Sequence, residues 1–121
     1  MSISENPLEQ LKHMMRSFAD HRDWNQFHSP KNLAMALSVE AAELVEHFQW
    51  LTEEQSRNLS DEQLNGVSQE LADTLLYLVR IADKLDIDLF SAAQAKMKLN
   101  NQKYPVDKSR GNAKKYTELA S

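Results

Sequence analysis

Apolar residues recur every three or four positions through four long stretches of this chain. This spacing is typical of amphipathic helices and predicts them over residues 7–22, 30–51, 60–85 and 89–103, with a short helical turn within 52–59. Only 2 glycines and 3 prolines occur among 121 residues, too few for the frequent turns of a β-sandwich or barrel. We therefore expect an all-α fold, in which four helices with short connections form a four-helix bundle-like protomer.

Polar residues that favour helix starts precede three of these stretches. Ser29 stands directly before Pro30, Ser60 is followed three positions later by Gln63, and Asp88 follows a short connection. The side-chain oxygens of Ser and Asp accept backbone N–H groups that have no partner in the first helical turn. These residues therefore predict where the second, third and fourth helices begin.

The charge and cysteine content exclude several classes of protein. The formal net charge is −4, which argues against a broad nucleic-acid-binding surface, and the absence of cysteine excludes disulfides and thiolate metal sites. No apolar run is long enough to span a membrane, and residues 1–7 lack the basic and apolar segments of a signal peptide. We expect a cytoplasmic protein with one domain over residues 1–106 and a polar, basic tail over 107–121. A chain this short buries a modest core alone, so a homodimer or homotetramer is expected.

One carboxylate lies where an apolar residue is expected. Glu40 falls within the apolar stripe of the 30–51 helix, and Glu43 lies at the edge of that stripe, with Glu46 further out. An unpaired carboxylate that faces a core is costly unless a charge compensates it or a proton neutralises it. A single ExxE pair is usually a solvated helix face, but Glu40 inside the stripe favours a functional role.

The 60–85 helix repeats this arrangement. Glu70 and Asp73 lie three residues apart along one border of its apolar stripe, with Tyr77 one turn further. If the two helices face each other, four carboxylates converge and a cation must neutralise them. An all-oxygen ligand set with high negative charge suits a hard ion, Mg²⁺ or else Mn²⁺. A di-iron site is disfavoured, because none of the four histidines has a Glu three residues before it. The remaining common use of such an ion is phosphate chemistry.

Other side chains suit the recognition of a nucleotide. Lys96 and Asn100 continue the apolar face of the 89–103 helix with polar groups that can bind phosphate oxygens and a base or sugar. Trp24, His28 and Trp50 lie near the two ends of the second helix, and nucleobases stack on such rings. The alternatives remain open: the Lys96 stem can simply cover apolar surface, and the aromatic residues can form a small satellite core.

The spacing of these carboxylates resembles the signature of the MazG-like superfamily of all-α nucleoside triphosphate pyrophosphatases, EExxE followed by ExxD. Here the motif is Glu40-x-x-Glu43 and, after 26 intervening residues, Glu70-x-x-Asp73, with Val39 in place of the first Glu. Several further segments over about residues 8–119 resemble the branch that acts on dCTP: Arg22–His28, Glu43–Trp50, Lys96–Pro105 and Lys115–Leu119.

The resemblance implies hydrolysis of a nucleoside triphosphate to the monophosphate and diphosphate, with Mg²⁺ held by Glu40, Glu43, Glu70 and Asp73. It suggests deoxycytidine nucleotides, including base-modified ones, as substrates and dimers of dimers as the assembly. It also implies two sets of substrate-binding residues. Those near the base are Trp24, His28, Trp50, Tyr77 and Asn100, and those near the phosphates or sugar are Lys96, Lys103 and Tyr104.

We expect metal-assisted attack of water on a phosphorus, with Glu43 or Glu46 taking the proton. One alternative is a non-enzymatic helical assembly or regulatory module, in which Glu40 forms a structural ion pair with Lys96. Another keeps the chemistry but acts on dUTP, dATP or damaged nucleotides.

Overall fold

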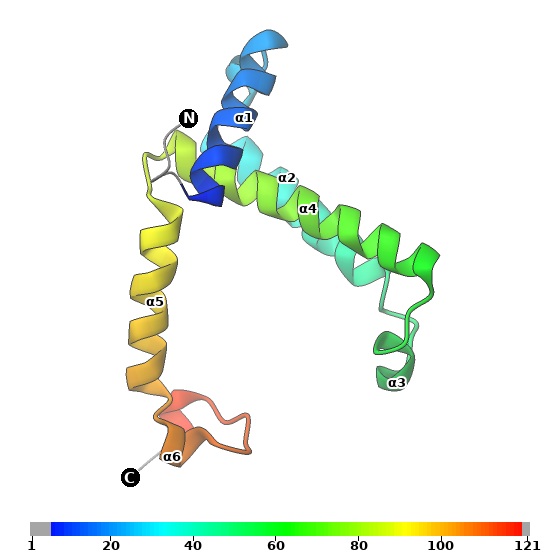
Figure 1. Ribbon diagram of the computed structural model, residues 1–121, viewed down its shortest axis with the longest axis vertical. Helices are drawn as coiled ribbons and strands as arrows, with labels where there is room; N and C mark the ends of the chain where they lie inside the picture. Colours follow the sequence, from blue (N-terminus) through cyan, green and yellow to red (C-terminus); the bar gives the residue numbers. More distant parts are fainter. Residues whose placement is uncertain (1–5, 120–121) are drawn as a thin grey trace. The chain divides into compact units, whose positions relative to one another are not determined.

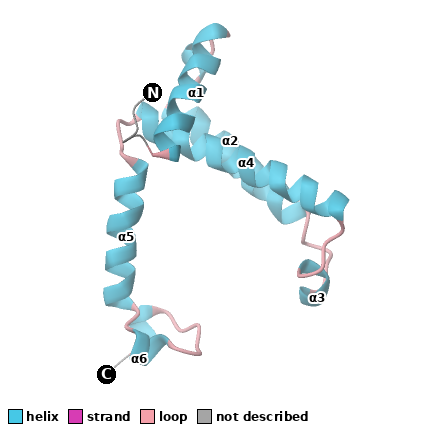
Figure 2. Cartoon of the chain, viewed as in Figure 1, coloured by secondary structure: helices cyan, strands magenta, loops and turns pink. Residues whose placement is uncertain are grey.

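The residues that the structure describes form helices joined by turns and loops. A computed structural model describes residues 6–119, with only the backbone of residue 116, and these residues contain no strand (Figure 2). The all-α prediction is therefore confirmed. The elements are, in chain order, α1 (Pro7–His21), η1 (Asn25–Phe27), α2 (Pro30–Glu46), α3 (Glu53–Ser56), α4 (Asp61–Lys84), α5 (Leu89–Lys103), α6 (Val106–Ser109) and η2 (Tyr116–Glu118).

Side-chain caps begin the helices where the sequence predicts. Ser29 accepts the N–H of Asn32 at the start of α2, and Asp88 accepts that of Ser91 at the start of α5. Ser60 and Thr52 each form a reciprocal capping box, at α4 and α3. Because these caps satisfy N–H groups that the helix leaves unpaired, they fix the first residue of each helix.

The second helix ends earlier than predicted. We expected it to extend to Leu51, but α2 ends at Glu46 and is followed by turns. The N–H of His47 bonds to the carbonyl of Leu44 at 3.2 Å, three residues back, which is the tightened pattern of a helix end. The residues after Glu46 include His, Phe and Trp, which are weaker helix formers, and Thr52 caps a new helix. The chain therefore turns between Glu46 and Thr52.

The chain forms two compact units, Met1–Ile87 and Asp88–Ser121, and each is described by itself. In the first, α2 and α4 lie side by side along their length and α1 packs against α4 (Figure 1). The second contains α5, α6 and η2, so short helical segments occur around and within the polar, basic tail. Three of the four predicted long helices thus pack within one unit, while α5 belongs to the other. The domain boundary predicted at residue 106 stays a prediction. The prediction that the N-terminus is not a signal peptide falls mostly on residues 1–5, which lie outside the described residues.

Only part of the predicted apolar stripe of α4 is buried. Val67, Val79 and Ala82 are buried among its apolar residues, but a row of four leucines is 38–52% exposed: Leu71, Leu75, Leu78 and Leu85. The apolar stripe predicted from the helical period comprises these leucines together with Val67, Thr74 and Ala82. Within the first unit the helix therefore turns only part of that stripe inward and leaves the leucine row exposed.

Gly66 allows a close contact between two elements of the first unit. A Cβ atom at this position would lie 2.8 Å from Cε1 of the His47 ring, which is closer than carbon atoms approach without strain. A side chain at this position would displace the His47 ring, so Gly66 permits the present close packing of the end of α2 against α4. In the described residues no helix is long and apolar enough to cross a membrane.

Candidate active site

Three carboxylates from two helices meet within the first unit. Glu40 and Glu43 lie one turn apart on α2, and Glu70 lies on the adjacent α4. One oxygen from each lies within 4.8 Å of the others, and all three residues are half-buried. The predicted convergence of acidic groups from two helices is therefore present in the structure for these three residues.

The electrostatics of Glu40 reflect this crowding. The nearby Glu70 carboxyl group, with which Glu40 can share a proton, raises the pKa of Glu40 to about 7, helped by burial and by the negative charges of Glu43 and Asp73. One oxygen of Glu40 and one of Glu70, Oε2 in each case, are buried and have no hydrogen-bond donor among the described residues. Buried carboxylate oxygens are costly without a donor or cation. The cluster therefore suits a bound cation, and its oxygen-only donor set suits a hard divalent one.

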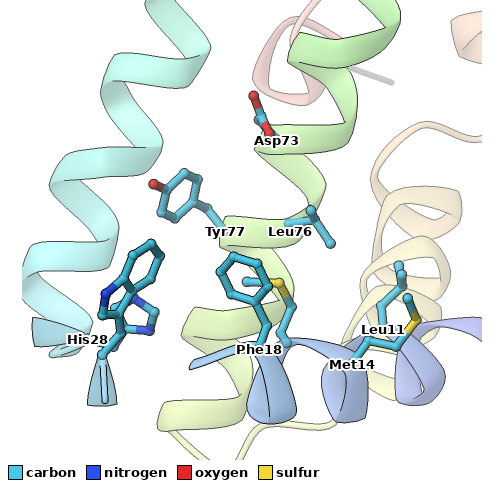
Figure 3. A pocket seen from close by; sticks show the side chains of 9 residues that line it. Leu11, Met14, Phe18, His28, Asp73, Leu76 and Tyr77 are labelled. Carbon is cyan, nitrogen blue, oxygen red and sulfur yellow. The ribbon is translucent and has the colours of Figure 1, made fainter. Parts of the chain in front are cut away.

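The two remaining predicted acidic residues lie outside this group of three. Asp73 lies one turn beyond Glu70 on α4, near enough for its charge to act on Glu40, and its side chain is exposed. It lines the adjacent pocket, above Tyr77 on the same helix (Figure 3). Glu46 is exposed near the end of α2. Their roles as ligand and proton acceptor stay predictions.

A mainly apolar pocket of about 420 Å³ lies beside α4, a volume in the range of small-molecule sites. Side chains from α1, from the segment between α1 and α2, and from α4 form its walls (Figure 3). The lining residues are Leu11, Met14, Met15, Phe18, Trp24, His28, Asp73, Leu76 and Tyr77. Three predicted base-binding residues, Trp24, His28 and Tyr77, thus line one pocket together with a predicted metal ligand.

Edge-to-face ring contacts order the aromatic wall of this pocket. The rings of Phe18 and Trp24 lie 5.5 Å apart at 72°, and those of Trp24 and His28 lie 6.2 Å apart at 64°. The guanidinium of Arg22 lies 3.7 Å from the centre of the Phe18 ring. Such contacts stabilise aromatic residues in fixed orientations. Trp24 nevertheless remains 42% exposed, so part of its surface is free to contact a ligand.

A buried arginine that was not among the predicted site residues lies behind His28. Arg80 on α4 is only 2% exposed, and its Nε donates to Nδ1 of His28 at 3.1 Å. Its other nitrogens bond to Asn25 and to Asp83, which also receives two hydrogen bonds from Arg16. The Arg16 guanidinium holds the pKa of Asp83 below its usual range. The sequence did contain a signal, since Arg80 stands between Val79 and Ile81 with Asp83 three residues on.

The other predicted substrate-binding residues lie elsewhere in the chain. Trp50 lies beyond the far end of α2 and is 86% exposed. The remaining four lie on α5 or at its C-cap, within the second unit: Lys96, Asn100, Lys103 and Tyr104. Their contacts with a nucleotide, and the alternative ion pair of Glu40 with Lys96, stay predictions.

Comparison with known proteins gives consistent results. The MazG-like family model matches residues 35–119. The chain is 43% identical over 118 residues to dCTP pyrophosphatase 1 from Bos taurus, which covers 96% of this chain and 70% of the relative. It is 40% identical over 121 residues to dCTP pyrophosphatase 1 from Homo sapiens, covering 98% and 71%.

A solved structure resembles the chain closely. The crystal structure of a pyrophosphatase from Archaeoglobus fulgidus superposes with a TM-score of 0.78 at 36% sequence identity. The match covers 87% of this chain and 98% of the archaeal one. Both the sequence and the arrangement of helices are therefore shared with proteins named for the same chemistry.

Proposed function

Because this chain belongs to the MazG-like family, we propose that it is a nucleoside triphosphate pyrophosphohydrolase that requires a divalent cation. The reaction consumes water and releases a nucleoside monophosphate and diphosphate. The single observation that carries the proposal is the group of Glu40, Glu43 and Glu70, whose oxygens lie within 4.8 Å of one another beside a pocket of small-molecule size.

The donor set fits Mg²⁺, with Mn²⁺ as a second possible ion. Glu40, Glu43 and Glu70 would hold it, with Asp73 as a fourth ligand from the adjacent turn of α4. The buried Oε2 atoms of Glu40 and Glu70 lack hydrogen-bond donors among the described residues, and a cation would compensate both. When bound, such an ion binds phosphate oxygens, offsets the charge that develops on them and acidifies a coordinated water.

The carboxylates on α2 then have separate tasks. Attack of a water oxygen on the α-phosphorus breaks the P–O bond between the α and β phosphates, and diphosphate leaves. The proton of this water needs an acceptor, and we assign it to Glu43 or to Glu46 one turn further along α2. Glu43 lies within the cluster and Glu46 is exposed. Because Glu43→Gln would also remove a proposed metal ligand, the informative variant is Glu46→Gln: retained activity would assign the proton to Glu43, and loss of activity would assign it to Glu46.

We propose dCTP or a base-modified dCTP as the substrate, since the two relatives described above are named for dCTP. The base would lie in the apolar pocket against Trp24, His28 and Tyr77, next to Asp73 and the cation. We also keep as proposed contacts Lys96, Lys103 and Tyr104 for the phosphates or sugar, and Asn100 and Trp50 for the base.

We propose that a second copy of the chain covers the exposed leucines of α4, as a homodimer or a dimer of dimers. Four leucines of one helix at 38–52% exposure leave an apolar surface that a soluble chain of this size rarely leaves uncovered. The mass of the protein in solution tests this. The nucleotide substrate also supports a cytoplasmic location, with neither nucleic acid nor membrane as a partner.

The decisive experiment is a panel of dNTPs with diphosphate detection, with and without Mg²⁺. We expect diphosphate release, fastest with dCTP or a modified dCTP, and none after addition of EDTA or in Glu40→Gln. A non-enzymatic helical module would release no diphosphate from any of them. Its melting temperature would also be unchanged by Mg²⁺ plus a dNTP, whereas a bound ligand must raise it.

A further inference from the structure

One ring nitrogen of His28 already accepts a hydrogen bond within the protein. Nε of Arg80 donates to its Nδ1 at 3.1 Å, and the Arg80 side chain is buried at 2% exposure. Two further contacts fix the guanidinium, with the Asn25 side chain and with an Asp83 oxygen at 3.3 Å. The donor to His28 is therefore held from both sides and has little freedom to turn away.

The chemistry of a guanidinium determines the proton on the histidine. Arginine carries only N–H donors and remains charged, so the atom that receives its hydrogen bond must present a lone pair. Nδ1 of His28 therefore carries no proton, and in the neutral ring the proton is on Nε2. Burial, and then the positive charges of Arg80 and Lys84, lower the pKa of His28, which keeps the ring neutral.

We infer that Arg80 is a positioning residue that makes His28 a hydrogen-bond donor, through Nε2–H, to the ligand of the pocket. The inference rests on the proposed function for the identity of that ligand, a nucleobase. It requires the base to present an acceptor to His28, either a carbonyl oxygen or an unprotonated ring nitrogen. Cytosine has both, side by side on one edge, and its exocyclic amino group is a donor that His28 would not accept.

The test compares two arginines that share Asp83 as a partner. Arg80→Met removes the donor to His28, whereas Arg16→Met removes only the half-exposed outer arginine and leaves the Arg80–His28 bond in place. The ¹⁵N and ¹H shifts of ¹⁵N-histidine-labelled protein report the tautomer and pKa of His28. Steady-state kinetics with dCTP report KM and kcat separately.

We expect His28 to be the Nε2–H tautomer in the wild-type protein and in Arg16→Met. In Arg80→Met the ring should populate both tautomers, with its pKa returning toward the usual value. KM for dCTP should rise about three- to tenfold, as expected for one misplaced hydrogen bond, with kcat nearly unchanged. A merely structural role for Arg80 would lower stability and active fraction without moving the tautomer.

A wild-type spectrum with the proton on Nδ1 would overturn the inference, and so would an Arg80→Met variant with unchanged tautomer and KM. The wild-type spectrum decides by itself if Arg80→Met fails to fold. The tautomer measurement needs no turnover, so it tests the role of Arg80 separately from the proposed function. A protein that hydrolyses no nucleotide but contains the Nε2–H tautomer would refute the proposed function only.

Discussion

Replacing Glu40 with Gln should stabilise the metal-free protein at pH 8. A rise in the pKa of this carboxyl from its usual 4.5 to about 7 corresponds to about 3 kcal/mol against the ionised folded state. Glu40 is half-buried and shares its environment with Glu43 and Glu70, so solvent screening and charge sharing reduce this to about 1–2 kcal/mol. Gln keeps the size of the side chain and removes the charge. The gain should therefore appear as added free energy of unfolding.

Stability depends on pH because Glu40 has a different pKa in the folded and the unfolded protein. Between pH 4.5 and 7 the unfolded chain has released the Glu40 proton while the folded protein retains it, so stability decreases as pH rises through this range. The advantage of Glu40→Gln should thus be near zero at pH 4.5 and complete above pH 7. The lowered pKa of His28 has the opposite effect, because stability falls as pH drops below 6.5. His28 is present in both proteins, so its effect cancels in the difference in free energy of unfolding between Glu40→Gln and the wild type, which is the quantity to measure.

Urea denaturation at fixed protein concentration, in EDTA, from pH 5 to 8, measures this difference. Glu54→Gln is a matched control, because Glu54 is an exposed carboxylate outside the cluster. At pH 8, Mg²⁺ should stabilise the wild type more than Glu40→Gln. If Glu40→Gln is no more stable than the wild type at pH 8 without metal, the carboxylates are not crowded enough to need a cation.

Three other substitutions test separate features of the first unit. Gly66→Ala should displace the His47 ring, because its Cβ would lie 2.8 Å from Cε1, and this displacement should offset the better helix propensity of Ala. In a His47→Ala background the same change should raise the free energy of unfolding by about 1 kcal/mol in urea denaturation. Asp86 has a φ of 57°, so Asp86→Gly should raise stability by about 0.5–1 kcal/mol in a thermal melt. Trp24→Ala should raise KM for dCTP more than it lowers kcat, and an unchanged KM would exclude Trp24 from the base site.

The acidic cluster was predictable because it depends on two periodic helices. Glu40 stands out in the sequence as a carboxylate within an apolar stripe, and the i, i+3 spacing brings Glu43 to the same face. Each helix start was also predictable, since a cap such as Ser60 needs only residues within one turn. Local rules were therefore sufficient for the features that local geometry decides.

Contacts between distant segments were not predictable in the same way. The hydrogen bond from Arg80 to His28 joins residues 52 positions apart, and a single sequence gives no indication that they meet. The row that includes Leu71 and Leu75 has a correct apolar period, yet it is exposed in the single chain. Periodicity identifies an apolar face but does not say whether the same chain covers it or a second copy does.

The position of the pocket along α4 would let one nucleotide reach both parts of the proposed site. Glu70, Asp73 and Tyr77 lie on successive turns of this helix, so the step from the acidic cluster to the pocket wall is about 10 Å along its axis. A nucleotide extended along this face can place its phosphates at Glu70 and its base beside Tyr77. Asp73 lies between them, lining the pocket while its charge acts on Glu40. In the proposed function, base recognition and phosphate chemistry would therefore depend on the same helix, and Arg80, further along α4, would orient the histidine of the pocket from that helix as well.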